Sequence, residues 1–140
     1  MERQLSALPL IGRLLIGLPF MMSGLGKLAA YGPTVQHIGA AGLPLPPLSY
    51  AAAVAIELGG GLLLVLGYQA RLAAAAQAVF AVMAAAFFHA QFADQNQMIH
   101  FLKNIMMAGG LLQIVYFGAG RWSLDSRLAG RAGTVEVARG

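Results

Sequence analysis

The chain lacks cysteine and has few charged residues. Without cysteine it forms no disulfide and has no thiolate to serve as a nucleophile or metal ligand. Charged residues make up 10% of its 140 residues, whereas soluble domains carry roughly 25%. So few charges cannot cover the surface of a small soluble domain. A soluble enzyme and a nucleic-acid-binding protein are therefore both excluded.

Apolar residues are abundant instead and form 59% of the chain. A helix of roughly 20 apolar residues crosses the hydrocarbon core of a bilayer. Four segments meet this requirement, at about 5–30, 49–68, 72–89 and 99–118. The sequence thus predicts an all-α, integral membrane four-helix bundle within residues 1–128. The remaining segment, 129–140, has little apolar surface to bury and is predicted to be a disordered tail.

Positive charge is distributed unequally between the two sides of the predicted bundle. The arginines, at the N-terminus, in the turn between spans two and three and in the tail, are Arg3, Arg13, Arg71, Arg121, Arg127, Arg131 and Arg139. Only Lys27 and Lys103 lie toward the other side. The positive-inside rule then places both termini in the cytoplasm. The net charge of +4 reflects this topology and does not indicate an anionic partner.

The segment between the first two spans, residues 31–48, is apolar and rich in proline. Thr34 is expected to cap a short helix over residues 35–38, which Gly39 or Gly42 would end. We expect this outer segment to lie on the membrane surface or to re-enter the bundle in part. The outer loop 91–97 is polar throughout and is expected to face water.

Glu57 is the most informative polar residue inside the predicted membrane. It lies about 12 Å below the outer end of its span, where an isolated carboxylate takes up a proton or pairs with a cation. Lys103 enters the fourth span from the same side to a depth of about 7 Å and is the best match. Lys27 lies nearer the outer surface, and Arg13 approaches from the cytoplasmic half. We therefore predict a Glu57–Lys103 pair, with Arg13 as a second contact.

Other polar residues gather toward the same outer side. Gln77, Ala81, Ala85 and His89 follow one another at intervals of four and so share one face of the third span. On the fourth span, His100 and Asn104 have the same spacing and lie beside Lys103. Two histidines and a carboxylate are compatible with a metal or a haem. Both histidines flank a loop, however, so we expect neither group. The cluster is either a structural ion pair or a site for a proton, an anion or a quinone.

Short motifs occur in a characteristic order over nearly the whole chain. They are Arg13, 23–28 (SGLGKL), 42–46 (GLPLP), 57–64 (ELGGGLLL), Gly67, Arg71, His89, 101–104 (FLKN) and 118–125 (GAGRWSLD). In this order and spacing the chain resembles the DoxX family of small four-helix bacterial membrane proteins. The resemblance implies a bundle in the bacterial cytoplasmic (inner) membrane. It also implies that the residues of the family pattern are, in this chain, Arg13, Lys27, Glu57, His89, Lys103 and Asn104.

Some members of that family are regarded as small subunits of quinone-linked sulfur-oxidising or oxidative-stress complexes. The resemblance therefore implies an accessory subunit of a membrane redox system, or a subunit of such a system that interacts with quinone or lipid. Such a subunit lies within the lipid bilayer. Its candidate partners are a redox partner subunit and further copies of itself in a homo-oligomer. The chain has no catalytic motif, so an oxidoreductase role would require a complex. A small proton, ion or solute transporter is the alternative, and a purely structural membrane subunit is a second one.

Overall fold

The computed structural model describes residues 6–137, and the side chains of residues 6–130. Four helical stretches are long and apolar enough to cross a membrane, which confirms the predicted all-α fold class. They are α2 (Leu8–Ala29), the continuous stretch α4 (Pro46–Val54), η1 (Ala55–Gly60) and α5 (Gly61–Leu66), then α6 (Ala70–Phe88) and α7 (Gln95–Phe117). The described residues contain no strand.

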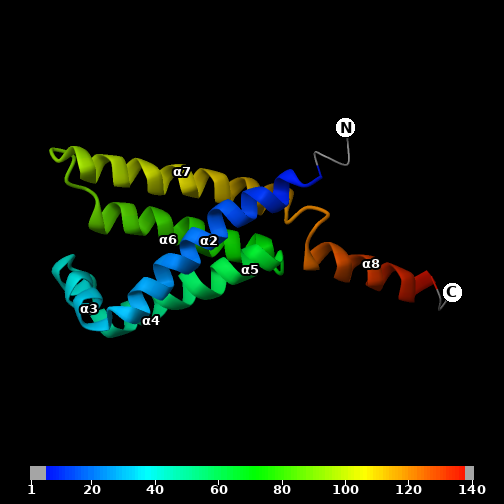
Figure 1. Cartoon of the computed structure of the whole chain (residues 1–140), viewed down its shortest axis with the longest axis horizontal. Coiled ribbons are helices and arrows are strands. Elements are labelled where there is room, and N and C mark those ends of the chain that lie inside the picture. The colour runs from blue at the N-terminus through cyan, green and yellow to red at the C-terminus, as the bar shows by residue number, and fades with distance from the viewer. Residues whose placement is uncertain (1–5, 138–140) are drawn as a thin grey trace.

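The four spans form two packed pairs that lie along one long axis (Figure 1). Helix α6 packs against α7, and α2 packs against η1 and α5. The start of α2, the α5–α6 turn and α8 (Leu124–Val137) lie at one end, here named the arginine end. The opposite end, named the histidine end, carries α3 (Tyr31–Ala40) and the α6–α7 turn. That the arginine end faces the cytoplasm stays a prediction of the charge distribution.

Glycine allows α2 and the second span to approach until their backbones touch. A Cβ atom added to Gly17 would lie 2.9 Å from the carbonyl oxygen of Gly61, and one added to Gly61 would lie 2.8 Å from that of Gly17. Gly24, two turns further along α2, faces Leu58 and Glu57 in the same way. Close packing through small residues is typical of helices in membranes. It brings the polar residues of α2 within reach of those on η1.

The predicted buried face of α6 is confirmed for most of its length. Gln77, Ala81 and Ala85 are fully buried, whereas His89 at the end of the stripe is half-buried. The alanines accept the close approach of α7, and Leu111 of α7 completes the apolar core beside them. This core fills the middle of the bundle and the half nearer the arginine end. A cavity is left in the other half.

The outer segment forms a longer helix than predicted. Helix α3 begins at Tyr31, and Pro33 lies within its first turn, where proline costs no hydrogen bond. The predicted cap by Thr34 is wrong, because Thr34 lies inside the helix and its hydroxyl donates to the carbonyl of Ala30 at 2.7 Å. The chain turns after α3 at Gly42, with φ of +79°. Ile38 is buried, so the segment does pack into the bundle in part.

The segment predicted as a disordered tail, 129–140, is helical through Val137, where α8 ends. Ser123 precedes this helix as its cap, since its Oγ accepts from the backbone N–H of Ser126 at 3.1 Å. Asp125 anchors the first turn: its carboxylate accepts from the N–H groups of Gln69 and Ala70 at 2.7 and 3.0 Å. Low apolar content argues against burial, but a capped and anchored start is enough to begin a helix. Residues 138–140 lie outside the described residues.

Candidate functional site

Glu57 lies on a π-helical turn in the middle of the second span. The turn covers Ala55–Gly60 and shifts the backbone hydrogen bonds by one residue relative to the flanking α-helices. Gln77 of α6 donates to the carbonyl of Ile56 at 3.3 Å and so supplies a partner to this irregular backbone. Single π turns inside α-helices occur frequently at functional sites. The turn was not predicted, although the consecutive glycines that follow Glu57 are a signal for irregular helix.

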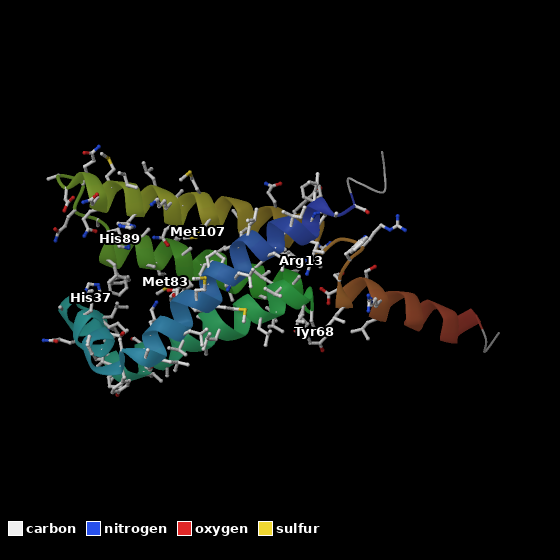
Figure 2. All side chains as sticks on the ribbon, viewed as in Figure 1. Arg13, His37, Tyr68, Met83, His89 and Met107 are labelled. Carbon is white, nitrogen blue, oxygen red and sulfur yellow. The ribbon has the colours of Figure 1, made fainter. Side chains whose placement is uncertain are left out.

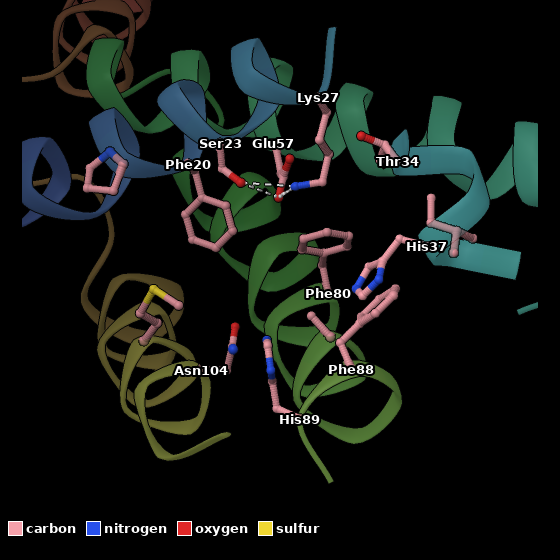
Figure 3. A pocket seen from close by; sticks show the side chains of 14 residues that line it. Phe20, Ser23, Lys27, Thr34, His37, Glu57, Phe80, Phe88, His89 and Asn104 are labelled. Carbon is pink, nitrogen blue, oxygen red and sulfur yellow. Dashed lines mark hydrogen bonds and ion pairs between the residues drawn. The ribbon is translucent and has the colours of Figure 1, made fainter. Parts of the chain in front are cut away.

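The carboxylate of Glu57 pairs with Lys27 and Ser23 of α2. Lys27 Nζ lies 2.8 Å from Glu57 Oε1, and Ser23 Oγ lies 3.1 Å from the same oxygen (Figure 3). Lys27 also donates to Ser23 Oγ at 3.0 Å, which closes a small network. Glu57 is buried, and its other oxygen, Oε2, has no hydrogen-bond partner. The site therefore holds a paired carboxylate with one acceptor left unused.

The predicted Glu57–Lys103 pair is wrong. Lys103 is exposed on α7, and the only ion pair among the described side chains is that of Lys27 with Glu57. The reason lies in the helix neighbours: α2 packs against η1, whereas α7 packs against α6. Lys27 and Ser23 are four residues apart on α2, so both face the carboxylate. Lys103 matches Glu57 in depth but lies on a helix that does not contact η1 closely.

The predicted second contact of Glu57, Arg13, is also wrong. Arg13 is 1% exposed and lies toward the arginine end (Figure 2). Its Nη1 donates to the carbonyls of Leu64 and Val65 at 2.8 and 3.2 Å, and its Nη2 donates to the carbonyl of Trp122. The guanidinium thus caps carbonyls at the C-terminal end of the second span, of which that of Leu64 also accepts from the N–H of Gly67 at 3.1 Å. Arg13 is a structural tie between α5 and the segment that leads into α8.

Gly67 makes room for that tie. It has a φ of +65°, the left-handed region that favours glycine, and a Cβ atom there would lie against Arg13 Nη1. The guanidinium therefore lies directly over the backbone of the α5–α6 turn.

A cavity of about 420 Å³ lies beside the Glu57 network, between α2, α3, α6 and α7. Its polar lining consists of Ser23, Lys27, Thr34, His37, Glu57, His89 and Asn104. Its apolar lining includes the rings of Phe20, Phe80 and Phe88, which lie between the Ser23–Lys27–Glu57 group and the side chains of Asn104 and His89 in Figure 3. The volume is within the range of small-molecule sites, roughly 300–1,000 Å³, and so is the mixture of aromatic walls with few polar groups.

The structure brings together four of the predicted site residues and adds Ser23, Thr34 and His37. Lys27, Glu57, His89 and Asn104 line the cavity, whereas Arg13, His100 and Lys103 do not. His37 also lines the cavity, and its ring stacks on that of Phe88 at a centroid distance of 5.1 Å. Sequence reasoning missed His37 because it assigned the outer segment no place in the site. The expected partial re-entry of this segment into the bundle was the one indication that His37 could reach the site.

The two histidines at the ends of α6 and α7 contact one another. The rings of His89 and His100 stack at 5.1 Å, and His89 Nδ1 lies 2.9 Å from Gln97 Oε1. Asn104 donates to the backbone carbonyl of His100 at 3.0 Å. No three His, Cys, Asp or Glu side chains within the described part of the chain gather closely enough to hold a metal. The histidine pair therefore lies at the edge of the cavity, with His89 in its lining and His100 outside it.

An apolar groove of about 220 Å³ adjoins the cavity on the side of α4 and α6. Lys27, Ile38, Phe80, Ala84 and Phe88 line both spaces, so the groove and the cavity share a wall. The rest of the groove is lined almost entirely by apolar residues of α4, η1 and α6, among them Val79, Met83 and Phe87. These three are exposed on the outer surface of the spans, where lipid chains would lie.

Comparison with known proteins gives both a family and close relatives. The model of the DoxX family matches residues 8–90. The inner membrane protein YqjF of Escherichia coli (strain K12) is 34% identical over 85% of this chain and 90% of its own length. The inner membrane protein YphA of the same organism is 32% identical over 84% of this chain and 88% of its own. No solved structure matches. Four apolar helices and these relatives support a multi-pass inner membrane protein, and the chain belongs to the DoxX family.

Proposed function

We propose that this chain binds the head of a quinone in the cavity beside Glu57, as an accessory subunit of a membrane redox system. The observation that carries the proposal is the buried carboxylate of Glu57, paired with Lys27 and Ser23 in the wall of an aromatic cavity within the membrane spans. Polar groups at this depth are costly and are usually retained for function.

The donors around the cavity suit a flat ring that carries two carbonyl oxygens. Lys27 and Asn104 each have a donor group in the lining, and His37 and His89 add imidazole nitrogens. Phe20, Phe80 and Phe88 supply apolar faces against which a ring packs. A bound quinone would supply two-electron, two-proton redox chemistry. Glu57, whose Oε2 has no partner, is the group in the cavity wall that holds or releases a proton.

The adjoining groove gives the apolar tail of such a ligand a place to lie. The shared wall of Ile38, Phe80, Ala84 and Phe88 allows a head in the cavity to continue into a chain between α4 and α6. A polar head with an apolar tail matches the polar cavity and the apolar groove in that order. This favours a membrane-borne quinone over a small water-soluble solute.

The test is quinone retention by the purified full chain. Wild-type protein, reconstituted in nanodiscs with ubiquinone, is expected to bind it, as measured by solvent extraction and mass spectrometry over a concentration series. Lys27→Met is expected to weaken binding at least tenfold, since a charge-assisted hydrogen bond contributes about 1.5–3 kcal/mol. Lys103→Met removes a lysine that is exposed on α7 and is the matched control, with unchanged binding.

Two results would contradict the proposal. One is the absence of bound quinone in wild-type nanodiscs, and the other is equal weakening by Lys27→Met and Lys103→Met. Thermal unfolding of each variant shows whether a loss of binding reflects a loss of fold. The Glu57→Gln, Lys27→Met double variant removes both charges together and so avoids leaving either one unpaired.

Transport is the second candidate, because a buried carboxylate with an unused oxygen also suits a proton carrier. On the arginine side of Gln77 the side chains of Leu64, Ala74 and Leu111 are fully buried, and the buried guanidinium of Arg13 is bound to backbone carbonyls. This favours a binding site over a path through the bundle. Proteoliposomes are therefore expected to show the same proton flux with wild-type protein, with Glu57→Gln and with no protein. A flux that requires Glu57 would make transport the function instead.

A further inference from the structure

We propose a second site, at the arginine end, that binds the headgroup of an anionic phospholipid. A cavity of about 570 Å³ lies between the start of α2, the end of α5 and the start of α8. Arg121 and Arg127 line it together with the exposed ring of Trp122. Leu10 of α2 and Val65 and Leu66 of α5 form its apolar side. This site is separate from the cavity beside Glu57 and does not rest on the proposed function.

Neither of the two arginines has an ion-pair partner within the described part of the chain. Both side chains are exposed, and neither takes part in the single ion pair among the described residues. The acidic residue at the start of α8, Asp125, is already used, since both of its carboxylate oxygens accept from backbone N–H groups of the α5–α6 turn. Two guanidinium groups that line one cavity and form no ion pair fit a phosphate, which guanidinium groups bind through paired hydrogen bonds.

The surroundings favour the phosphate of a lipid over a free one. Leu10, Val65 and Leu66 belong to membrane-spanning helices, so a ligand at the arginines has apolar side chains beside it. Trp122 is 61% exposed, and tryptophan is enriched at the membrane–water interface. The charge distribution predicts that this end faces the cytoplasm, where the leaflet surface is negative. An anionic phospholipid would place its headgroup at the two arginines beside Trp122 and its acyl chains along the apolar residues of α2 and α5.

The backbone that presents the two arginines is held in place. Arg13 binds the carbonyl of Trp122 from inside the bundle. Ser123 is buried, and its hydroxyl donates to the carbonyl of Gly120 at 2.6 Å and caps α8. Arg121 and Arg127 are therefore carried on either side of a backbone turn that these hydrogen bonds hold.

The test is lipid binding by the full chain in detergent, measured by native mass spectrometry with phosphatidylglycerol, phosphatidylcholine and soluble glycerol phosphate. Wild-type protein is expected to prefer phosphatidylglycerol at least tenfold. Arg121→Gln and Arg127→Gln are each expected to weaken its binding about fivefold, and the double variant about 25-fold. Lys103→Gln removes one exposed charge from the other half of the bundle and is expected to have no effect.

Equal binding of the two lipids, or unchanged binding by the double arginine variant, would overturn the proposal. Glycerol phosphate that binds as tightly as phosphatidylglycerol would overturn the assignment to a lipid. Arg121→Lys with Arg127→Lys keeps the charge and is expected to restore part of the binding, which a general loss of fold would not allow. Quinone retention is expected to be unchanged in every arginine variant, so the two proposals fail separately.

Discussion

Replacement of Arg13 by methionine is expected to lower the free energy of unfolding by about 3 kcal/mol or more. The guanidinium is buried and donates to three backbone carbonyls, two at the end of α5 and one at Trp122. Methionine has a similar length but no donor, so these carbonyls lose their side-chain partner in an apolar region. Unfolding in mixed micelles with increasing SDS, followed by circular dichroism, measures the change.

Two further variants show whether the hydrogen bonds of Arg13 are the cause. Arg13→Lys keeps the charge but is expected to recover little stability, because one ammonium cannot reproduce the fork that reaches α5 and Trp122 together. Lys103→Met makes a comparable change at an exposed position and is expected to have an effect below about 0.5 kcal/mol. A loss of less than about 1 kcal/mol for Arg13→Met would contradict the structural role.

Replacement of Gly61 by alanine is expected to cost about 2–3 kcal/mol. Its added Cβ atom would lie 2.7 Å from Met21 Cγ and 2.8 Å from the carbonyl oxygen of Gly17, so α2 would have to move away from the second span. The same SDS titration measures the loss. Because Lys27 on α2 reaches Glu57 across this interface, quinone retention is expected to fall as well.

Gly59 provides a matched control two residues earlier in the same run of glycines. A Cβ atom added there meets nothing within 4 Å. Gly59→Ala is therefore expected to leave stability unchanged or to raise it by up to about 1 kcal/mol, since alanine favours the helix over glycine. Equal losses for Gly59→Ala and Gly61→Ala would show that the close contact between α2 and α5 is not what stabilises this interface.

The sequence was sufficient to predict the spans and the buried face of α6. Length and hydrophobicity define a membrane helix almost completely, and a spacing of four residues defines its faces. The face that carries Gln77, Ala81 and Ala85 is buried as expected. The order of the short motifs also indicated the DoxX family, which the family model over residues 8–90 confirms.

The partner of Glu57 could not be predicted from the sequence. Position along the chain gives the depth of a residue in the bilayer, but it does not say which helices are neighbours. Depth alone favoured Lys103 over Lys27, which lies nearer the outer surface, whereas the actual pairing depends on α2 packing against η1. That packing in turn depends on the backbone contact between Gly17 and Gly61. The place of His37 in the cavity likewise depends on how the outer segment folds back.

Under the proposed function, the groove between α4 and α6 would be the route by which the ligand reaches the cavity beside Glu57. Its lining residues Val79, Met83 and Phe87 are exposed on the lipid-facing surface, and Phe80 and Phe88 lie between them and the cavity. A hydrophobic ligand can therefore enter sideways from the bilayer without crossing water. Its effective concentration is then the concentration dissolved in the lipid, so modest intrinsic affinity is enough for occupancy.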